Sequence, residues 1–217
     1  GDGMDVFSSS NVILDGVFCS NSDDCAAVYA STQGFKGGSN NVLVKNATLW
    51  ADVAHPINIG GHGDPNGMDT VQNVTFRNID ILDQAEKQID YQGCLAINPR
   101  DNTFVRNITF ENIRIEDFRN GQLVNFRISF NPKYCVSTGR GIQNVLVKDV
   151  TYNGSGENLS IIAGYDENHK ISGIWFVNLV VNGRKITDDM PGKPKWYKTG
   201  DMAGIFVGEH VENLSFE

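Results

Sequence analysis

An apolar pattern that repeats along the chain limits the folds open to it more than any other feature. In each copy, the first and third positions after the starting residue are apolar, the sixth and eighth are mostly apolar, and the fifth is often Asn or Asp. The copies begin at Asn11, Asn41, Asn73, Asn107, Asn144, Gly173 and, near the end of the chain, Asn213. Successive starts lie 29 to 40 residues apart. One structural unit therefore recurs, and neighbouring units are expected to bury each other's apolar faces.

Within each copy the apolar residues alternate with polar ones, which is the period of a β-strand. The step between the third and sixth positions breaks this period. It predicts a bend between two short strands, where the Asn side chain satisfies backbone groups. Because no helical pattern fills the intervals, we predict an all-β, single-stranded parallel β-helix of about six to seven coils, with residues 1–217 as one domain. A β-sandwich also has many short strands, but it does not predict one pattern repeated in register.

The third position after each start makes this prediction specific. The side chains expected to stack inside the coil are those of Val44, Phe76, Phe110, Val147 and Phe176. No helical pattern caps either end of the chain, although the open ends of a β-helix invite association. We therefore expect the chain to be a piece of a longer protein, without the N-terminal coils and end caps of its parent, or a natural truncation.

Charge and composition argue against several classes of function. The chain has 18 Lys and Arg against 26 Asp and Glu, a net charge of −8, whereas nucleic-acid binding needs a basic face. No run of about 18 apolar residues predicts a membrane span, and no signal-peptide pattern begins the chain. The 4 His residues are scattered and no CxxC motif occurs, so we expect neither a metal ion nor another cofactor. Cys19 and Cys94 fall in apolar strand patterns and are expected in the core.

Asp2, Asp23 and Asp24 are the strongest candidates for catalytic side chains. Asp23 follows Asp2 by 21 residues, which is close to one turn of such a coil, so the three carboxylates are expected to meet on one wall. Adjacent residues on a straight strand point to opposite faces, and Asp23 and Asp24 therefore need a bend to act together. Carboxylates on opposite sides of a glycosidic bond perform sugar hydrolysis. The pattern indicates a polysaccharide or oligosaccharide as the partner of this wall.

Further polar residues are predicted on the same face of later coils. His62 precedes its repeat start by 11 residues, close to the offset of 9 between Asp2 and the first start. The next coil offers Asp90 and Tyr91, and Arg127 follows on the coil after that. We expect His62, Asp90 and Arg127 to bind the substrate.

Three short segments occur in an order that is typical of one enzyme family. They are DGMD (residues 2–5), SDDCAAV (22–28) and GHG (61–63). They resemble signatures of the polygalacturonases, the pectin-cleaving right-handed parallel β-helices of glycoside hydrolase family 28. The resemblance implies that Asp23 is the general acid, that Asp2 and Asp24 activate water on the opposite face, and that the product is inverted. It also implies that His62 tunes the acid and that Arg127 contacts the substrate.

The fourth signature of that family, RIK, is only partly matched. Arg127 is followed by Ile128 and Ser129, so the Lys that would hold a galacturonate carboxylate is missing. We therefore expect weak activity on plain polygalacturonate and a preference for a branched pectic or neutral glycan. Lys133 and Arg100 are the alternative cations.

Two other functions stay open. One is hydrolysis of neutral α-glucans, as by dextranases and α-1,3-glucanases. The other is carbohydrate binding without catalysis, as in an adhesin. A polysaccharide substrate implies a protein that works outside the cell or in the periplasm.

Overall fold

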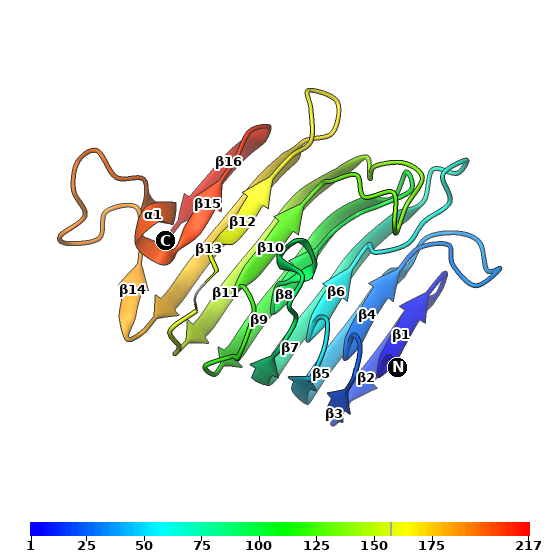
Figure 1. The fold of residues 1–217 in the computed structure, drawn as a ribbon, viewed down its shortest axis with the longest axis horizontal. Coiled ribbons are helices and arrows are strands. Elements are labelled where there is room, and N and C mark those ends of the chain that lie inside the picture. The colour runs from blue at the N-terminus through cyan, green and yellow to red at the C-terminus, as the bar shows by residue number, and fades with distance from the viewer. Residues whose placement is uncertain (157) are drawn as a thin grey trace.

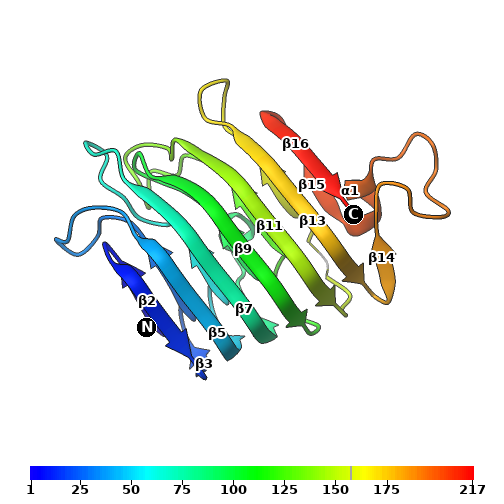
Figure 2. The ribbon, with the colours of Figure 1, turned by 180° about the vertical axis from the view of Figure 1, so that it is seen from behind.

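The computed structural model describes residues 1–156 and 158–217 and shows a right-handed parallel β-helix (Figure 1). The chain runs along one sheet, returns through the sheet behind it and advances by one strand at each turn (Figure 2). The first sheet, which we name sheet A, has seven strands, so the described chain makes seven coils. The predicted fold and the predicted number of coils are confirmed.

Sheet A is built from short strands. In spatial order they are β1 (Met4–Phe7), β4 (Ala26–Tyr29), β6 (Ile57–Ile59), β8 (Leu95–Ile97), β10 (Val124–Arg127), β12 (Ser160–Ala163) and β15 (Ile205–Val207). The opposite sheet, sheet B, carries the repeat and its strands are mostly longer. They are β2 (Ser10–Asp15), β3 (Phe18–Asn21), β5 (Asn40–Ala51), β7 (Thr70–Gln84), β9 (Phe104–Ile115), β11 (Gly141–Tyr152), β13 (Ile171–Val181) and β16 (Val211–Phe216), with β14 (Arg184–Ile186) antiparallel to β13.

Helical structure is limited to two short elements, η1 (Ile89–Tyr91) and α1 (Thr199–Ala203), within the described ranges. None of the helices described there is long and apolar enough to cross a membrane. The loop that contains η1 leaves β7, lies over sheet A and returns to β8.

The space between the two sheets is filled by rows of side chains in register. The row of predicted core residues is continuous and is at most 1% exposed: Val44, Phe76, Phe110, Val147 and Phe176. The rings of Phe76 and Phe110 stack with centroids 5.8 Å apart. Burial of such rows supplies most of the folding free energy of a coil, because each coil covers its neighbours. The core positions of Cys19 and Cys94 are also confirmed.

Asn residues at the start and at the fifth position of the repeat turn the strands of sheet B through left-handed backbone conformations. The φ angles are 57° at Asn41 and 55° at Asn46, a region that Asn adopts more readily than most residues. In the first coil the fifth position is Gly16, and there β2 and β3 are separate strands. In β5, β7, β9, β11 and β13 the predicted break is instead a kink within one strand, because the pairing with neighbouring coils continues on both sides.

The Asn side chains also form hydrogen-bonded ladders on the surface of sheet B. Asn78 Nδ2 donates to Asn46 Oδ1 at 2.7 Å, and Asn112 Nδ2 donates to Asn78 Oδ1 at 3.4 Å. Asn78→Ala is expected to lower the free energy of unfolding by about 1–3 kcal/mol, because it removes both ladder bonds and the bond that Asn78 Oδ1 accepts from Arg114, and leaves a strained left-handed residue. Asn78→Gly relieves the strain and is expected to lose less. Denaturant unfolding measures both variants, and equal losses would contradict the strain argument.

Candidate active site

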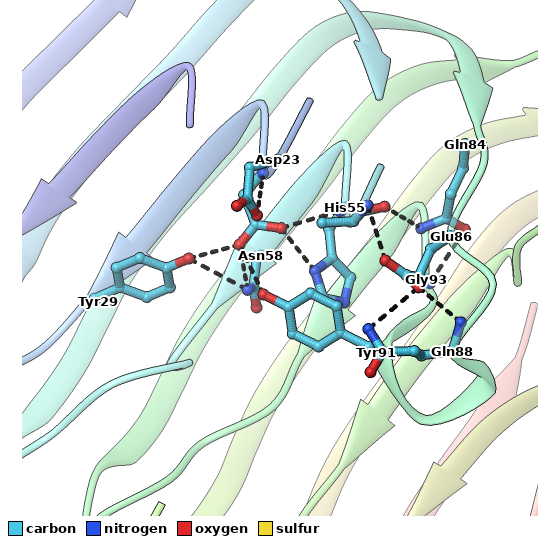
Figure 3. Close-up of polar contacts among 11 residues, drawn as sticks. Asp23, Tyr29, His55, Asn58, Gln84, Glu86, Gln88, Tyr91 and Gly93 are labelled. Atoms are coloured by element: carbon cyan, nitrogen blue, oxygen red, sulfur yellow. Dashed lines mark hydrogen bonds and ion pairs between the residues drawn. The ribbon is translucent and has the colours of Figure 1, made fainter. Parts of the chain in front are cut away.

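Asp24 lies at the centre of a buried hydrogen-bond network at the start of β4. It is 1% exposed. Its Oδ1 accepts from the His55 backbone N–H at 3.0 Å and, with the ring proton on Nδ1, from the His55 imidazole at 2.8 Å. Its Oδ2 accepts from the Tyr29 hydroxyl at 2.6 Å and from Asn58 Nδ2 at 2.7 Å. Figure 3 shows Tyr29, Asn58 and His55 directed at one carboxylate from three sides.

This network keeps Asp24 ionised. Burial alone raises the pKa of a carboxyl group, but the charge of His55 and the bonds from His55, Asn58 and Tyr29 outweigh it and hold the pKa of Asp24 well below its usual range. A carboxylate offers about four lone-pair sites, and the four short contacts occupy them. The expected direct role of Asp24 in activating water stays a prediction. The arrangement suits a carboxylate that positions its neighbours.

The register of the coils brings the network together. Strands β1, β4 and β6 pair without offset, so the residues two positions before each strand lie side by side on successive coils. These residues are Asp2, Asp24 and His55. Backbone bonds continue the row, since Gly3 N–H donates to the Asp24 carbonyl at 2.8 Å and Cys25 N–H donates to the His55 carbonyl at 2.9 Å. The histidine at this level is His55, whereas His62 lies farther along the same coil.

His62 lies beyond the other end of β6. Its ring packs edge-on against the Tyr29 ring, with centroids 4.8 Å apart. Partial burial and the positive charge of Arg100 lower the pKa of the His62 imidazole, so it is neutral at pH 7. The number of residues between a site residue and its repeat start in sheet B does not fix its position on sheet A, because the loops between the sheets differ in length from coil to coil. His62 nevertheless lies close enough to Asp24 and Asp2 for their charges to act on the pKa of its imidazole.

Three further carboxylates, those of Asp2, Asp5 and Asp23, gather next to Asp24. Partial burial, a hydrogen bond with Asp2 and the charges of Asp2, Asp24 and Asp23 raise the pKa of Asp5 to about 7. Partial burial and the charges of Asp2 and Asp24 raise the pKa of Asp23. The structure thus brings the three predicted Asp residues together and adds Asp5. Acid–base catalysis needs a protonated carboxyl group beside an ionised one. Surroundings that differ between neighbouring carboxyl groups hold them in these two states.

Tyr91, on η1, reaches the network from the third coil. Its ring packs edge-on against the His55 ring at 4.3 Å between centroids, and its hydroxyl lies 3.5 Å from Asp24 Oδ2 (Figure 3). Within the described chain, His55 Nε2 and Asn58 Oδ1 are buried polar atoms without a hydrogen-bond partner. Because such atoms are rarely left unpaired, they are candidate contacts for a water molecule or a ligand hydroxyl.

Glu86 fixes the η1 loop against the preceding coil. Its Oε2 accepts from Ala54 N–H, next to His55, at 3.1 Å, and its Oε1 accepts from Gln88 N–H at 2.6 Å. The carboxylate is buried and therefore well placed to hold both backbones. Figure 3 shows Glu86 between the two segments.

Positive charge lies beside Tyr91. The guanidinium carbon of Arg100 is 5.8 Å from the centroid of the Tyr91 ring and 4.9 Å from that of the Tyr134 ring. Lys133 Nζ is 4.7 Å from the Tyr134 centroid and donates to Gln88 Oε1 at 3.3 Å. Arg100 thus lies beside Tyr91, the aromatic side chain that contacts Asp24, and Lys133 lies beside Tyr134, whose ring stacks on that of Tyr91.

Asp90 and Arg127 lie away from the Asp24 network. Asp90 is exposed on η1 and accepts from Asn131 Nδ2 at 3.1 Å. Arg127 ends β10, three strands from β4, which is about 14 Å at the usual strand spacing. It lines a groove of about 680 Å³ with Tyr165 and Phe206. Arg127 therefore faces a separate groove on the same sheet.

Sequence reasoning missed His55, Asp5 and Asn58, although each left a signal. His55 stands two residues before the apolar strand β6, as Asp24 stands two residues before β4. Asn58 is a polar residue between two buried Ile residues, and it is itself only 2% exposed. Asp5 occupies the same level of sheet A as Asn58, two strands away.

Comparison with known proteins assigns the family. Residues 1–190 match the family model for glycosyl hydrolases family 28. The chain belongs to this family. The probable endo-xylogalacturonan hydrolase A of Neosartorya fischeri is 30% identical over 164 residues, which are 75% of this chain and 38% of that protein. The exopolygalacturonase of Cochliobolus carbonum is 34% identical over 86 residues, which are 39% of this chain and 17% of that protein.

A solved structure has the same fold. The family 28 exopolygalacturonase of Yersinia enterocolitica superimposes with a TM-score of 0.58 at 15% sequence identity, over 99% of this chain and 38% of that one. The chain thus spans 38% of the length of both the Neosartorya relative and the solved structure.

Proposed function

We propose that this protein hydrolyses the galacturonan backbone of pectic polysaccharides and inverts the anomeric carbon. The observation that carries the proposal is the cluster of Asp2, Asp5 and Asp23 around a buried, ionised Asp24. Membership of glycosyl hydrolases family 28 supports the reaction class. Its substrate class implies that the protein works outside the cell.

In the proposed reaction Asp23 is the general acid. Its carboxyl proton passes to the glycosidic oxygen while the bond from that oxygen to the anomeric carbon breaks. Asp2 accepts a proton from a water molecule, whose oxygen bonds to the anomeric carbon from the opposite face. Asp5, protonated below about pH 7, donates the hydrogen bond that it shares with Asp2. This bond occupies one lone-pair site of the Asp2 carboxylate and leaves other sites for the water.

Asp24 acts as a positioning residue in this scheme. Burial, the charge of Asp2 and the fixed negative charge of Asp24 raise the pKa of Asp23, which keeps the acid protonated at higher pH. Asp24 also orients His55, whose Nε2 is free among the described residues to meet a substrate hydroxyl or a water molecule. His62 and Asp90 border the same side of sheet A and are proposed to contact the sugar chain. Arg127 contacts it in the groove farther along.

The proposed substrate is acidic. Relatives named as xylogalacturonan hydrolase and exopolygalacturonase act on galacturonan backbones according to their names. The sequence alone favoured a branched pectic or neutral glycan because the RIK-like triplet lacks its Lys. Arg100 and Lys133, grouped around Tyr91 and Tyr134, remove the reason for preferring a neutral glycan. We therefore place xylogalacturonan and polygalacturonate above dextran and α-1,3-glucan.

A reducing-sugar assay on these four polymers tests the proposal. We expect release of reducing ends from one or both galacturonans and none from the glucans. Proton NMR of the first product is expected to show the anomer opposite to that of the cleaved bond. Hydrolysis confined to a glucan, retention of configuration, or no hydrolysis of any of the four by the folded protein would each contradict the proposal.

A further inference from the structure

Arg100 is a nearly buried cation without an anionic partner. It is 7% exposed. Across residues 1–156 and 158–217, its guanidinium takes part in no ion pair or hydrogen bond. By contrast, Arg77, Arg114 and Arg119 are more exposed and each contacts a carboxylate. Burying a charge is unfavourable unless a partner compensates it, so the position of Arg100 calls for a partner that the described chain does not supply.

Aromatic rings and backbone hold Arg100 in place. Its guanidinium carbon lies over the Tyr134 ring at 4.9 Å and over the Tyr91 ring at 5.8 Å, and the two rings stack with centroids 5.5 Å apart. Its backbone N–H donates to the Gly60 carbonyl at 3.1 Å, which anchors the residue to the neighbouring coil. A guanidinium that stacks on aromatic faces keeps its N–H donors at the edge, in the planar fork that matches a carboxylate.

This fork lies next to the candidate active site. Tyr91, which packs on Arg100, also packs on His55 and lies 3.5 Å from Asp24. Lys133 adds a second positive charge on Tyr134. Because Asp24 is already saturated by other donors, Arg100 is not neutralised by a direct contact with it. A ligand with an anionic group beside the reacting bond would complete the arrangement.

We infer that Arg100 binds the carboxylate of the sugar residue next to the cleaved bond, with Tyr91 and Tyr134 as its rigid support. The inference rests on the proposed function, because it assumes that a sugar chain occupies the face formed by Asp2, Asp23 and Asp24. It assigns the selection of acidic over neutral sugars to Arg100, a position outside the segments that resemble the family signatures. The low exposure of Arg100 strengthens the interaction, since little water competes for it.

The test compares two ligands that differ only in charge: α-1,4-trigalacturonate and its carboxyl-reduced, neutral counterpart. Binding is measured by isothermal titration calorimetry in an Asp23→Asn background, so that the ligand is not consumed. The variants are Arg100→Met, which keeps the length of the side chain without its charge, and Arg100→Lys, which keeps a charge without the fork. Arg77→Met is the matched control. Arg77 pairs with Glu111, and both residues lie on sheet B, away from the candidate active site on sheet A.

We expect the parent and Arg77→Met to prefer trigalacturonate. In Arg100→Met this preference falls by about 10- to 100-fold, the usual effect of a charge-assisted hydrogen bond, while affinity for the neutral trisaccharide changes little. Arg100→Lys is expected to lie between, and it supplies the comparison if Arg100→Met does not fold. An unchanged preference in the Arg100 variants, an equal loss for both ligands, or no preference in the parent overturns the inference.

The experiment separates this inference from the proposed reaction. A wild-type protein that hydrolyses galacturonan but keeps its carboxylate preference without Arg100 contradicts the inference alone. A protein that shows the expected binding but hydrolyses none of the four polymers contradicts the proposed reaction and leaves the binding role of Arg100 standing.

Discussion

Asp23→Asn is expected to lower kcat by about 10²- to 10⁴-fold, the range for a positioned acid–base group. Asn has nearly the same shape but carries no acidic proton, so the leaving oxygen departs without protonation. The fold is expected to survive, because Asp23 is only partly buried and Asn keeps the oxygen that accepts the Asp24 N–H bond. Initial rates on the best galacturonan, with circular dichroism as a check of the fold, measure the effect.

The pH profile supplies the control for this assignment. The acid must be protonated, so wild-type activity is expected to fall as pH rises through the pKa of Asp23, which lies above that of an ordinary Asp. Because Asp5 also has a raised pKa, about 7, Asp5→Asn is the matched variant. It is expected to lower activity less than Asp23→Asn does. The opposite order would make Asp5 the acid, and full activity of Asp23→Asn would reject the assignment outright.

The sheet B half of the fold was predictable from sequence because one physical requirement recurs in every coil. Each strand must place apolar residues inward at fixed positions and Asn at each kink, and this leaves a pattern such as that from Val42 to Leu49. The strands of sheet A are only three or four residues long. A triplet such as Ile57–Ile59 is too short to show a period, so the sequence gives no reliable register for it.

That difference explains both the successes and the errors at the site. Asp23 and Asp24 were found because two adjacent carboxylates are conspicuous, and Asp2 because it lies one coil earlier. His55 was passed over in favour of His62 because positions were counted from sheet B, across loops of unequal length. The register of β4 and β6 decides the matter, and it is set by backbone pairing between residues about 31 apart, such as Ala26 and Ile57.

The sequence named Arg100 and Lys133 as alternative cations, but their grouping around Tyr91 and Tyr134 could not be derived from local pattern. Arg100 meets Tyr91 and Tyr134 only because loops from two successive coils fold over the same sheet. These contacts join residues that are 9 and 34 positions from Arg100, and nothing in the flanking sequence marks them. Such polar and aromatic clusters depend on loop conformation, which apolar periodicity does not specify.

Asp24→Ala is expected to lower the free energy of unfolding by about 3–5 kcal/mol, the loss that follows removal of one partner from a buried charged network. The variant leaves His55, Tyr29 and Asn58 buried without their acceptor. Activity is expected to fall as well, since burial and the charge of Asp2 still raise the pKa of Asp23 but the contribution of the Asp24 charge is lost. Urea unfolding of the variant and of Asp15→Ala measures the effect. Asp15 is an exposed carboxylate that pairs with Lys45 and accepts a hydrogen bond from Asn46, and its loss is expected to destabilise the protein much less than the loss of Asp24.

The pH dependence of stability gives Asp24→Ala a second, independent readout. The pKa of Asp24 is depressed in the folded protein, so its stabilising contribution is present above the pKa of an unfolded Asp, about 3.9, and is lost as pH falls below it. The wild type is therefore expected to lose stability between about pH 5 and pH 2 more steeply than Asp24→Ala does. Parallel curves for the two proteins over this range would mean that Asp24 is not ionised in the folded state. In that case neither its positioning of His55 nor its effect on Asp23 would hold as described.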